Sequence, residues 1–157
     1  MNLCADIQIA SEGDDNPDPD SIRAWLEAAL ADRIDSNENP IEVCVRIVDE
    51  AESQTLNKHY RQKDTSTNVL SFPSDLPKDI PVNHLGDIVI CNTIVKREAE
   101  AQGKEMRAHW AHMVIHGALH LLGYDHIEDD EANIMEALET KILDQLLFPP
   151  PYQQHSQ

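Results

Sequence analysis

One segment, residues 105–126, sets the strongest limits on the structure. Its first part has the pattern of a long helix, and the whole segment carries five histidines and a glycine at position 123. Residues four apart on a helix share a face, so His116 and His120 can offer two ring nitrogens to one metal ion. We expect a helix over about 105–122 that ends at Gly123, because glycine is favoured just after a helix end.

The turn at Gly123 can bring His126 back toward this helix as a third ligand. Three protein ligands leave one position open for water, which is the arrangement of catalytic zinc sites. Imidazole nitrogens favour zinc over magnesium or calcium, although nickel and copper also accept them. The sequence therefore predicts a zinc site formed by His116, His120 and His126.

Two further histidines leave the ligand set open. His112 and His116 are also four residues apart, so this pair could bind the metal instead. We prefer the downstream trio because the glycine turn gives a reason for His126 to return, and we expect His109 and His112 to support the ligands or to pack. Asp125 could orient a ligand imidazole, or it could be a solvent-facing turn residue.

A zinc protease helix with this spacing carries a glutamate directly after its first histidine, where it takes a proton from the zinc-bound water. Here that position is Gly117. Peptide hydrolysis by this route is therefore disfavoured. A phosphodiester instead places the developing charge on phosphoryl oxygens, which arginine binds well.

Two places in the chain could supply the remaining chemistry. Arg61 and Lys63 lie in the polar segment YRQKDTSTN, just before a strand pattern, where a loop residue can reach a cleft. The alternative is a solvated basic turn. Asp87 is a lone acid at the start of the apolar segment DIVIC, and it is either a capping or edge residue or a carboxylate that points into the site. We predict catalytic roles for Arg61, Lys63 and Asp87.

Hydrophobic periodicity predicts the secondary structure of the whole chain. We expect strands over about 3–10, 41–48, 69–73 and 85–92, and helices over about 22–34, 50–60, 93–102, 105–122 and 128–147. Asp20 or Ser21 would cap the first helix, and Asn92 or Thr93 the third. This order predicts an α+β fold, with a roughly four-stranded mixed sheet covered by about five helices, one of them a zinc-protease-like metal helix. We expect a single domain over 1–148 and a disordered proline-rich tail over 149–157.

Composition limits the classes of partner. The formal charge of −17 on 157 residues argues against nucleic acid, but eight of the twelve basic residues lie between positions 58 and 107, so a local positive surface is possible. Three widely spaced cysteines predict buried, reduced thiols. The start MNLCADIQIA has no signal-peptide pattern, and no segment is long and apolar enough for a membrane span. We therefore expect a cytoplasmic protein without a membrane partner.

The segments HGALHLLGYDH, YRQKDTSTNVLSFP and LGDIVIC closely resemble the bacterial YbeY family of metal-dependent endoribonucleases, over about residues 41–147. The resemblance implies one zinc ion held by His116, His120 and His126, and an essential arginine at Arg61. Lys63 and Asp87 align with positions that the family typically keeps near its cleft. The first forty residues match only in their general strand–helix pattern.

This resemblance implies a function in the cytoplasm. Family members cleave single-stranded RNA, mature the 3′ end of the small-subunit ribosomal RNA and take part in ribosome quality control. The expected partners are ribosomal RNA, the small ribosomal subunit with its proteins, and assembly GTPases, but not DNA. Two alternatives remain: a non-enzymatic ribosome-assembly factor with structural zinc, and a zinc peptidase with an unusual base.

Overall fold

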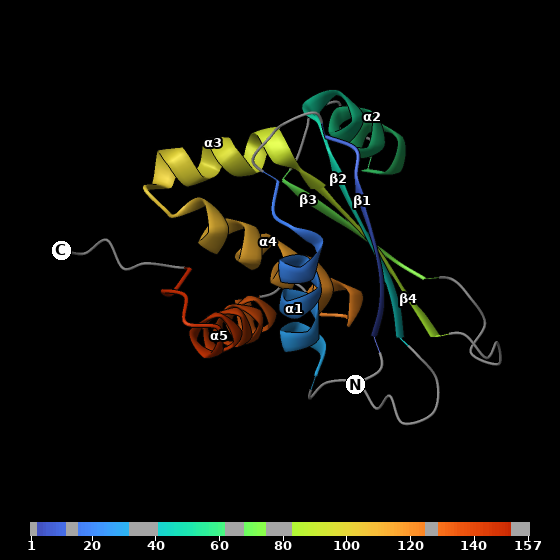
Figure 1. Ribbon diagram of the computed structural model, residues 1–157. Coiled ribbons are helices and arrows are strands. Elements are labelled where there is room, and N and C mark those ends of the chain that lie inside the picture. Colours follow the sequence, from blue (N-terminus) through green and yellow to red (C-terminus); the bar gives the residue numbers. More distant parts are fainter. Residues whose placement is uncertain are drawn as a thin grey trace.

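The computed structural model describes residues 3–11, 16–31, 41–61, 68–74, 83–124 and 129–151. Within these ranges the order of elements matches the predicted one (Figure 1). The strands are β1 (Leu3–Ile9), β2 (Ile41–Val48), β3 (Val69–Pro73) and β4 (Asn83–Cys91), and the helices are α1 (Pro19–Leu30), α2 (Glu50–Arg61), α3 (Asn92–Gln102), α4 (Met106–Leu121) and α5 (Asp129–Gln145).

The four strands form one mixed sheet in the order β1-β2-β4-β3. β1, β2 and β4 run parallel, whereas β3 pairs with β4 in the antiparallel sense. The register of β2 and β4 shifts between Glu42 and Val43, where one residue of β4 bulges out of the ladder. The predicted α+β fold with a four-stranded mixed sheet and five helices is confirmed.

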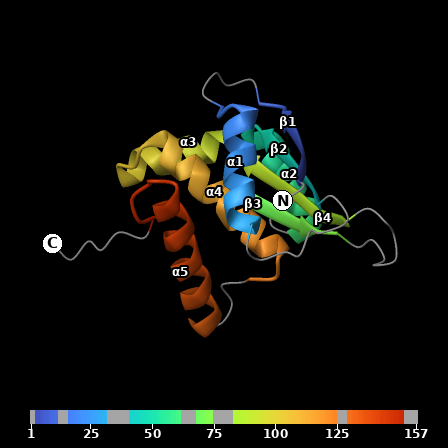
Figure 2. The same ribbon diagram turned by 60° about the horizontal axis from the view of Figure 1, so that its bottom comes forward.

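The sheet has two unlike faces. Figures 1 and 2 show α1 and α4 on one face, with α5 on the far side of α4. The alternating residues of β2 point to this face and are at most 1 % exposed, as their pattern predicted: Ile41, Val43, Val45 and Ile47. Full burial of such a side chain contributes roughly 1.5–3 kcal/mol. On the other face, Leu56 of α2 packs on a smaller cluster of Val48, Leu70 and Val89.

α4 is the central helix of the larger core. Eleven of its sixteen residues are buried, because it contacts the sheet together with α1, α3 and α5. A helix that is apolar on nearly all sides belongs in the interior. The histidines that it carries are therefore held in a rigid, tightly packed part of the molecule.

Some local predictions were wrong. α1 begins at Pro19, two to three residues earlier than expected, and Asp18 rather than Asp20 or Ser21 caps it by accepting a hydrogen bond from the Ser21 backbone. Proline suits this position because its missing N–H has no partner in the first turn. No side chain caps α3. Of the three thiols, Cys91 is buried, Cys44 is half-buried and Cys4 is exposed.

The segment after α5 returns toward α4. Within the tail predicted to be disordered, residues 149–151 are described, and Pro151 is buried. The Lys104 ammonium donates a hydrogen bond to the carbonyl oxygen of Pro151, at 2.8 Å. Residues 152–157 lie outside the described part of the chain. Among the described residues, no helix combines the length and apolar character that a membrane crossing requires.

Candidate metal centre

Four histidines of α4 follow one another along a single face, because residues three or four apart on a helix are neighbours. The ring centroids of His109 and His112 are 6.1 Å apart, those of His112 and His116 are 6.1 Å apart, and those of His116 and His120 are 4.6 Å apart. The first two side chains are buried and the last two are half-buried. The row thus runs from the interior of the protein toward its surface.

The two downstream histidines present their ring nitrogens to each other. The Nε2 atoms of His116 and His120 lie 3.1 Å apart. Two nitrogens that bind one zinc ion at about 2.0–2.1 Å lie roughly 3.0–3.5 Å apart at near-tetrahedral angles. The pair therefore has the spacing of two ligands of a single ion.

A buried carboxylate fixes the orientation of this pair. One oxygen of Glu139, in α5, is 2.8 Å from His116 Nδ1 and 2.9 Å from His112 Nε2. Burial raises the pKa of Glu139, but the hydrogen bonds from His112 and His116 outweigh it and bring the pKa to about 2. The carboxylate is ionised and only accepts hydrogen bonds, so Nδ1 of a neutral His116 carries the proton. The lone pair of Nε2 then faces His120.

The same residues form a second possible ligand set. The ligand atoms of His112, His116 and Glu139 all lie within 4.8 Å of one another, the one such group among the described residues. This set includes the His112–His116 pair that the sequence left open. His112 is 6 % exposed and Glu139 is fully buried. A metal ion in this position would be enclosed by protein.

The most upstream histidine is bound to another carboxylate. His109, which is 3 % exposed, lies with its Nε2 2.9 Å from an oxygen of Glu98 in α3. The side-chain amide of Asn68 contacts both oxygens of Glu98 at 3.3 Å. Burial raises the pKa of Glu98, but the hydrogen bonds from His109 and Asn68 outweigh it, and the pKa is lowered. Glu98 is thus ionised at neutral pH.

The chain turns sharply after the helix, as predicted. Gly123 has a φ of 104°, which favours glycine, and its backbone N–H donates to the His120 carbonyl. The N–H of Tyr124 donates to the carbonyl of Leu119. Asp125 and His126 follow directly but lie outside the described residues, so the third ligand stays a prediction.

The predicted basic residues are only partly within the described structure. Arg61 is the last residue of α2, and only its backbone is described. Lys63 falls in the segment 62–67, outside the described residues. The first described residue after this segment is Asn68, which lines one cavity together with His116. The described chain thus lies beside the histidines from Asn68 onward.

Asp87 is not brought together with the histidines. Its neighbours Gly86 and Ile88 face α4, since a β-carbon on Gly86 would meet Leu121 and one on Gly117 would meet Ile88. Side chains alternate along a strand, so Asp87 points to the opposite face of the sheet. There it is half exposed and lies 3.3 Å from a ring nitrogen of His84. A catalytic role for Asp87 stays a prediction.

Gly117 has a packing role that the sequence did not reveal. A β-carbon at this position would lie 2.8 Å from the Cγ2 of Ile88 and 3.3 Å from the hydroxyl of Ser71. That hydroxyl donates to the carbonyl oxygen of Gly117. The position that holds the base in zinc proteases is here pressed against β3 and β4. A glutamate side chain has no room there.

Glu98 and Glu139 were missed by the sequence analysis. A signal existed for Glu139, because it is four residues from both Met135 and Leu143, two buried residues of α5. An acid on a buried helical stripe needs a partner, and the histidine row of α4 offers one. The position of Glu98 gives no comparable signal, because its environment depends on how α3 packs against α4.

Comparisons with known proteins agree on one family. The family model described as Endoribonuclease YbeY matches residues 8–147. The Endoribonuclease YbeY of Pseudomonas putida (strain W619) is 55 % identical over 150 residues, covering 94 % of this chain and 91 % of the relative. That of Pseudomonas entomophila (strain L48) is 54 % identical over 148 residues, with the same coverage. The solution structure of TM1509 from Thermotoga maritima superposes with a TM-score of 0.60 at 28 % identity, covering 96 % of this chain and 99 % of that one.

Proposed function

The chain belongs to the Endoribonuclease YbeY family, and from this premise we propose that it is a metal-dependent endoribonuclease that cleaves single-stranded RNA. Its substrate is ribosomal RNA, matured at the 3′ end of the small-subunit RNA, and it also acts in ribosome quality control. The observation that carries the proposal is the pair of Nε2 atoms of His116 and His120, 3.1 Å apart, with His116 held by Glu139.

We assign one zinc ion to His116, His120 and His126. The donor set fits, because neutral imidazoles bind zinc and a carboxylate behind a ligand ring makes it a better base. A zinc ion in such a site acidifies a bound water and polarises phosphoryl oxygens. The set of His112, His116 and Glu139 is less suitable for catalysis, since Glu139 is fully buried and His112 is only 6 % exposed.

Glu139, Arg61 and Lys63 then have separate roles in the proposed reaction. Glu139 accepts hydrogen bonds from His112 and His116 and so keeps the Nε2 lone pair of His116 directed outward. The guanidinium of Arg61 binds the scissile phosphate and stabilises the charge that develops on its oxygens, and Lys63 adds a second cation. The attacking oxygen can come from water or from the RNA 2′-hydroxyl, since both are compatible with this arrangement.

The Asp87 carboxylate lies on the sheet face away from α4. We retain it as a proposed catalytic residue and test it with Asp87→Asn. A loss of cleavage rate of more than about 10-fold, with unchanged thermal unfolding, supports a role in the reaction. A rate within about threefold of wild type removes Asp87 from the site.

The strong negative charge bears on how RNA reaches the site. With a formal net charge of −17, the protein repels naked RNA at long range. We propose that the small ribosomal subunit, through its proteins or an assembly GTPase, delivers the RNA in the cytoplasm. Binding to naked RNA is then weak and falls steeply with salt. Tight binding that is insensitive to salt would contradict delivery by a partner.

The test combines metal analysis with cleavage of a ribosomal RNA fragment that contains the mature 3′ end. His116→Ala is expected to lose the bound metal and at least about 100-fold in rate. Arg61→Ala is expected to keep the metal and lose about 100- to 1,000-fold in rate. A matched control for Arg61→Ala is Arg97→Ala on α3, whose side chain is 63 % exposed and does not belong to the histidine row.

Two results would redirect the proposal. Full cleavage by His116→Ala or Arg61→Ala would exclude this mechanism. Bound metal without cleavage of any RNA would favour the non-enzymatic assembly factor, for which the enclosed set of His112, His116 and Glu139 offers a structural metal site. Turnover of protein substrates would revive the peptidase, although the packing of Gly117 leaves no room for the usual glutamate base.

A further inference from the structure

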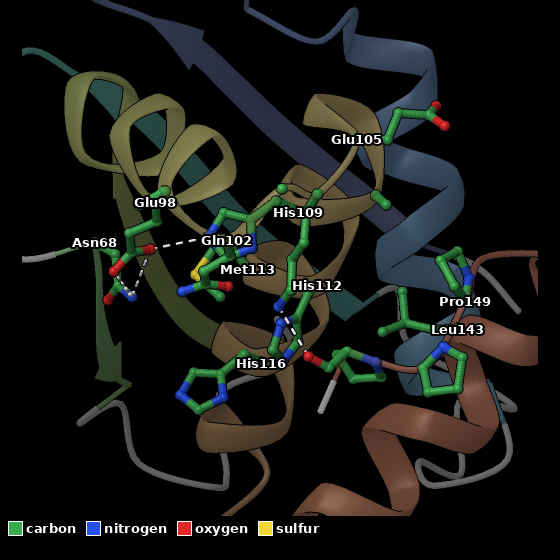
Figure 3. A pocket seen from close by; sticks show the side chains of 16 residues that line it. Asn68, Glu98, Gln102, Glu105, His109, His112, Met113, His116, Leu143 and Pro149 are labelled. Atoms are coloured by element: carbon green, nitrogen blue, oxygen red, sulfur yellow. Dashed lines mark hydrogen bonds and ion pairs between the residues drawn. The ribbon is translucent and has the colours of Figure 1, made fainter. Parts of the chain in front are cut away.

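The side chain of Asn68 joins the start of β3 to α3. Its amide nitrogen lies 3.3 Å from both oxygens of Glu98, as the dashed lines in Figure 3 show. Its amide oxygen accepts a hydrogen bond from the backbone N–H of Val69 at 2.7 Å, and its backbone carbonyl accepts one from the N–H of Cys91 at 2.9 Å. Both ends of the side-chain amide and the backbone of Asn68 are therefore fixed.

Glu98 is itself held by a residue of α4. One of its oxygens lies 2.9 Å from His109 Nε2, and its side chain is 30 % exposed. An ionised carboxylate accepts hydrogen bonds and donates none, so the ring of His109 and the amide of Asn68 both act as donors. Hydrogen bonds to a charged acceptor are stronger than those between neutral groups. These three residues, which we call the Asn68 clamp, connect β3 to α4 through α3.

The clamp requires an amide at position 68. An asparagine side chain has donors on its nitrogen and an acceptor on its oxygen, so it serves a carboxylate and a backbone N–H at the same time. Alanine there would leave His109 as the one remaining hydrogen-bond partner described for Glu98. Aspartate would place an oxygen where the amide nitrogen now lies, 3.3 Å from Glu98, and the two carboxylates would repel each other.

The clamp lies beside the proposed metal site. Asn68 and His116 line the same cavity. The next residue, Val69, faces α4, because a β-carbon on Gly117 would lie 3.3 Å from its Cγ2. The hydroxyl of Ser71 donates to the Gly117 carbonyl at 3.0 Å. The start of β3 is therefore held against the turn of α4 that carries His116.

The chain between Arg61 and Asn68 has both its ends attached to described elements. Arg61 is the last residue of α2, and Asn68 is fixed by the clamp. Holding both ends of a short segment reduces the number of conformations that are open to it, so less entropy is lost when the substrate binds. In an active site, a misplacement of about 1 Å can cost about 100-fold in rate. An anchor at Asn68 can therefore affect the position of the Arg61 side chain.

We propose that Asn68 is a positioning residue for the proposed reaction. Held by Glu98 and His109, it anchors the segment that begins at Arg61, so that the guanidinium meets the phosphate at the proposed metal ion. The inference rests on the proposed function for the reaction and for the role of Arg61. It adds a residue that acts through the arginine and not through the metal.

The first experiment asks whether Asn68 affects the rate without affecting the metal. Asn68→Ala is expected to lower the cleavage rate of the ribosomal RNA fragment by about 10- to 100-fold, while its zinc affinity stays within about threefold of wild type. Competition with a chelator measures the affinity. Asn133→Ala, exposed on α5, is the matched control and should change neither quantity. A wild-type rate for Asn68→Ala, or a loss of zinc that parallels the loss of rate, would overturn the proposal.

A double-mutant cycle with Arg61→Ala tests whether Asn68 acts through this arginine. If the clamp places the guanidinium, removing Asn68 costs little once the guanidinium is gone. We expect Asn68→Ala to reduce the single-turnover rate of Arg61→Ala by less than about threefold. A merely structural role of Asn68 would reduce the rate by the same factor in both backgrounds. Such an additive result would contradict positioning.

Exchanging the amide and the carboxylate of the clamp provides a rescue. In Asn68→Asp/Glu98→Gln, the amide at position 98 can accept from His109 and donate to position 68, which still accepts from the N–H of Val69. The net charge is unchanged. Asn68→Asp alone should lose about 10-fold or more in rate, and the exchange should restore the rate to within about threefold of wild type. Asn133→Asp controls for the added charge of the single variant.

The exchange also decides the matter if Asn68→Ala does not fold, which thermal unfolding would reveal. An exchange that restores the fold but not the rate would overturn the proposal. Cleavage by the wild type separates this inference from the proposed function. If the wild type cleaves RNA and Asn68→Ala cleaves it equally well, the positioning role falls and the endoribonuclease stands. If the wild type binds zinc but cleaves no RNA, the proposed function falls and the positioning role falls with it.

Discussion

The two halves of the histidine row on α4 differ in what surrounds them. His109 and His112 are buried, and each lies within 2.9 Å of a carboxylate oxygen, of Glu98 and Glu139 respectively. His116 and His120 are half-buried, and their Nε2 atoms face each other. The same residue type on the same helical face thus lies in two different environments. In the proposed site, burial and a carboxylate partner make a histidine a support, while partial exposure leaves a ring nitrogen for the proposed metal ion.

His116 contacts both halves of the row. The Nδ1 atom of His116 lies 2.8 Å from the Glu139 oxygen that also contacts His112, and its Nε2 atom faces His120. Loss of Glu139 should therefore disturb both the packing and the proposed metal site. The predictions below separate the two halves, in order of decreasing effect.

Glu139→Ala should have the largest effect on stability. It leaves the buried nitrogens of His112 and His116 without their acceptor and opens a cavity, so we expect the free energy of unfolding to fall by about 3–5 kcal/mol. Urea denaturation measures it. Asp144→Ala, exposed on the same helix, is the control and should change it by less than about 0.5 kcal/mol. Equal effects of the two variants would remove Glu139 from its supporting role.

His120→Ala and His109→Ala should have opposite effects. Loss of His120 should weaken zinc binding by at least about 100-fold and change the stability of the metal-free protein little. Loss of His109 should retain zinc binding within about 10-fold but cost about 1–3 kcal/mol, because Glu98 loses a buried partner. Competition with a zinc chelator and urea denaturation measure the two quantities. If His109→Ala releases zinc as readily as His120→Ala, the division of the row is wrong.

Gly117→Ala tests how closely α4 approaches the sheet. Overpacking against Ile88 costs about 1–3 kcal/mol, and the better helix propensity of alanine returns up to about 1 kcal/mol. We expect a net loss of about 1–2 kcal/mol by urea denaturation. In a double-mutant cycle with Ile88→Ala, the added methyl fills part of the new space, so the loss should shrink. Additive effects would mean that the two residues do not press on each other.

The smallest effect is a change in the pH dependence of stability. Burial raises the pKa of Glu98, but hydrogen bonds and the charges of His109 and Lys104 lower it below its usual 4.5. The ionised form therefore stabilises the fold above about pH 4.5, and this contribution is lost as the pH falls through the lower folded pKa. We expect less than about 1 kcal/mol, given the partial exposure of Glu98.

A comparison of variants isolates this contribution. Glu98→Gln should show a flatter decline in unfolding free energy below pH 4.5 than wild type. Glu100→Gln, exposed on the same helix, should follow the wild type. A Glu98→Gln curve parallel to that of wild type would show that Glu98 titrates alike in the folded and unfolded states.

Much of the fold was predictable because it depends on local patterns. Alternation in residues 41–48 gave the bounds of β2, the short stretch 69–73 that ends at a proline gave those of β3, and the helices matched within a few residues. The sheet order β1-β2-β4-β3 was not predicted, since strand pairing joins residues far apart in sequence. Cys4 is exposed because it lies with Asp6 and Gln8 on the outer face of the edge strand β1.

By itself, the sequence determined that four histidines share one helical face and that the chain turns at Gly123, because both depend on residues within a few positions of one another. Only the tertiary structure decided which histidines are supports. That division depends on Glu98 and Glu139, which are brought to α4 by two other helices. The tertiary structure also explains why position 117 is a glycine. Side chains of β3 and β4 come so close to α4 there that a β-carbon would clash with them.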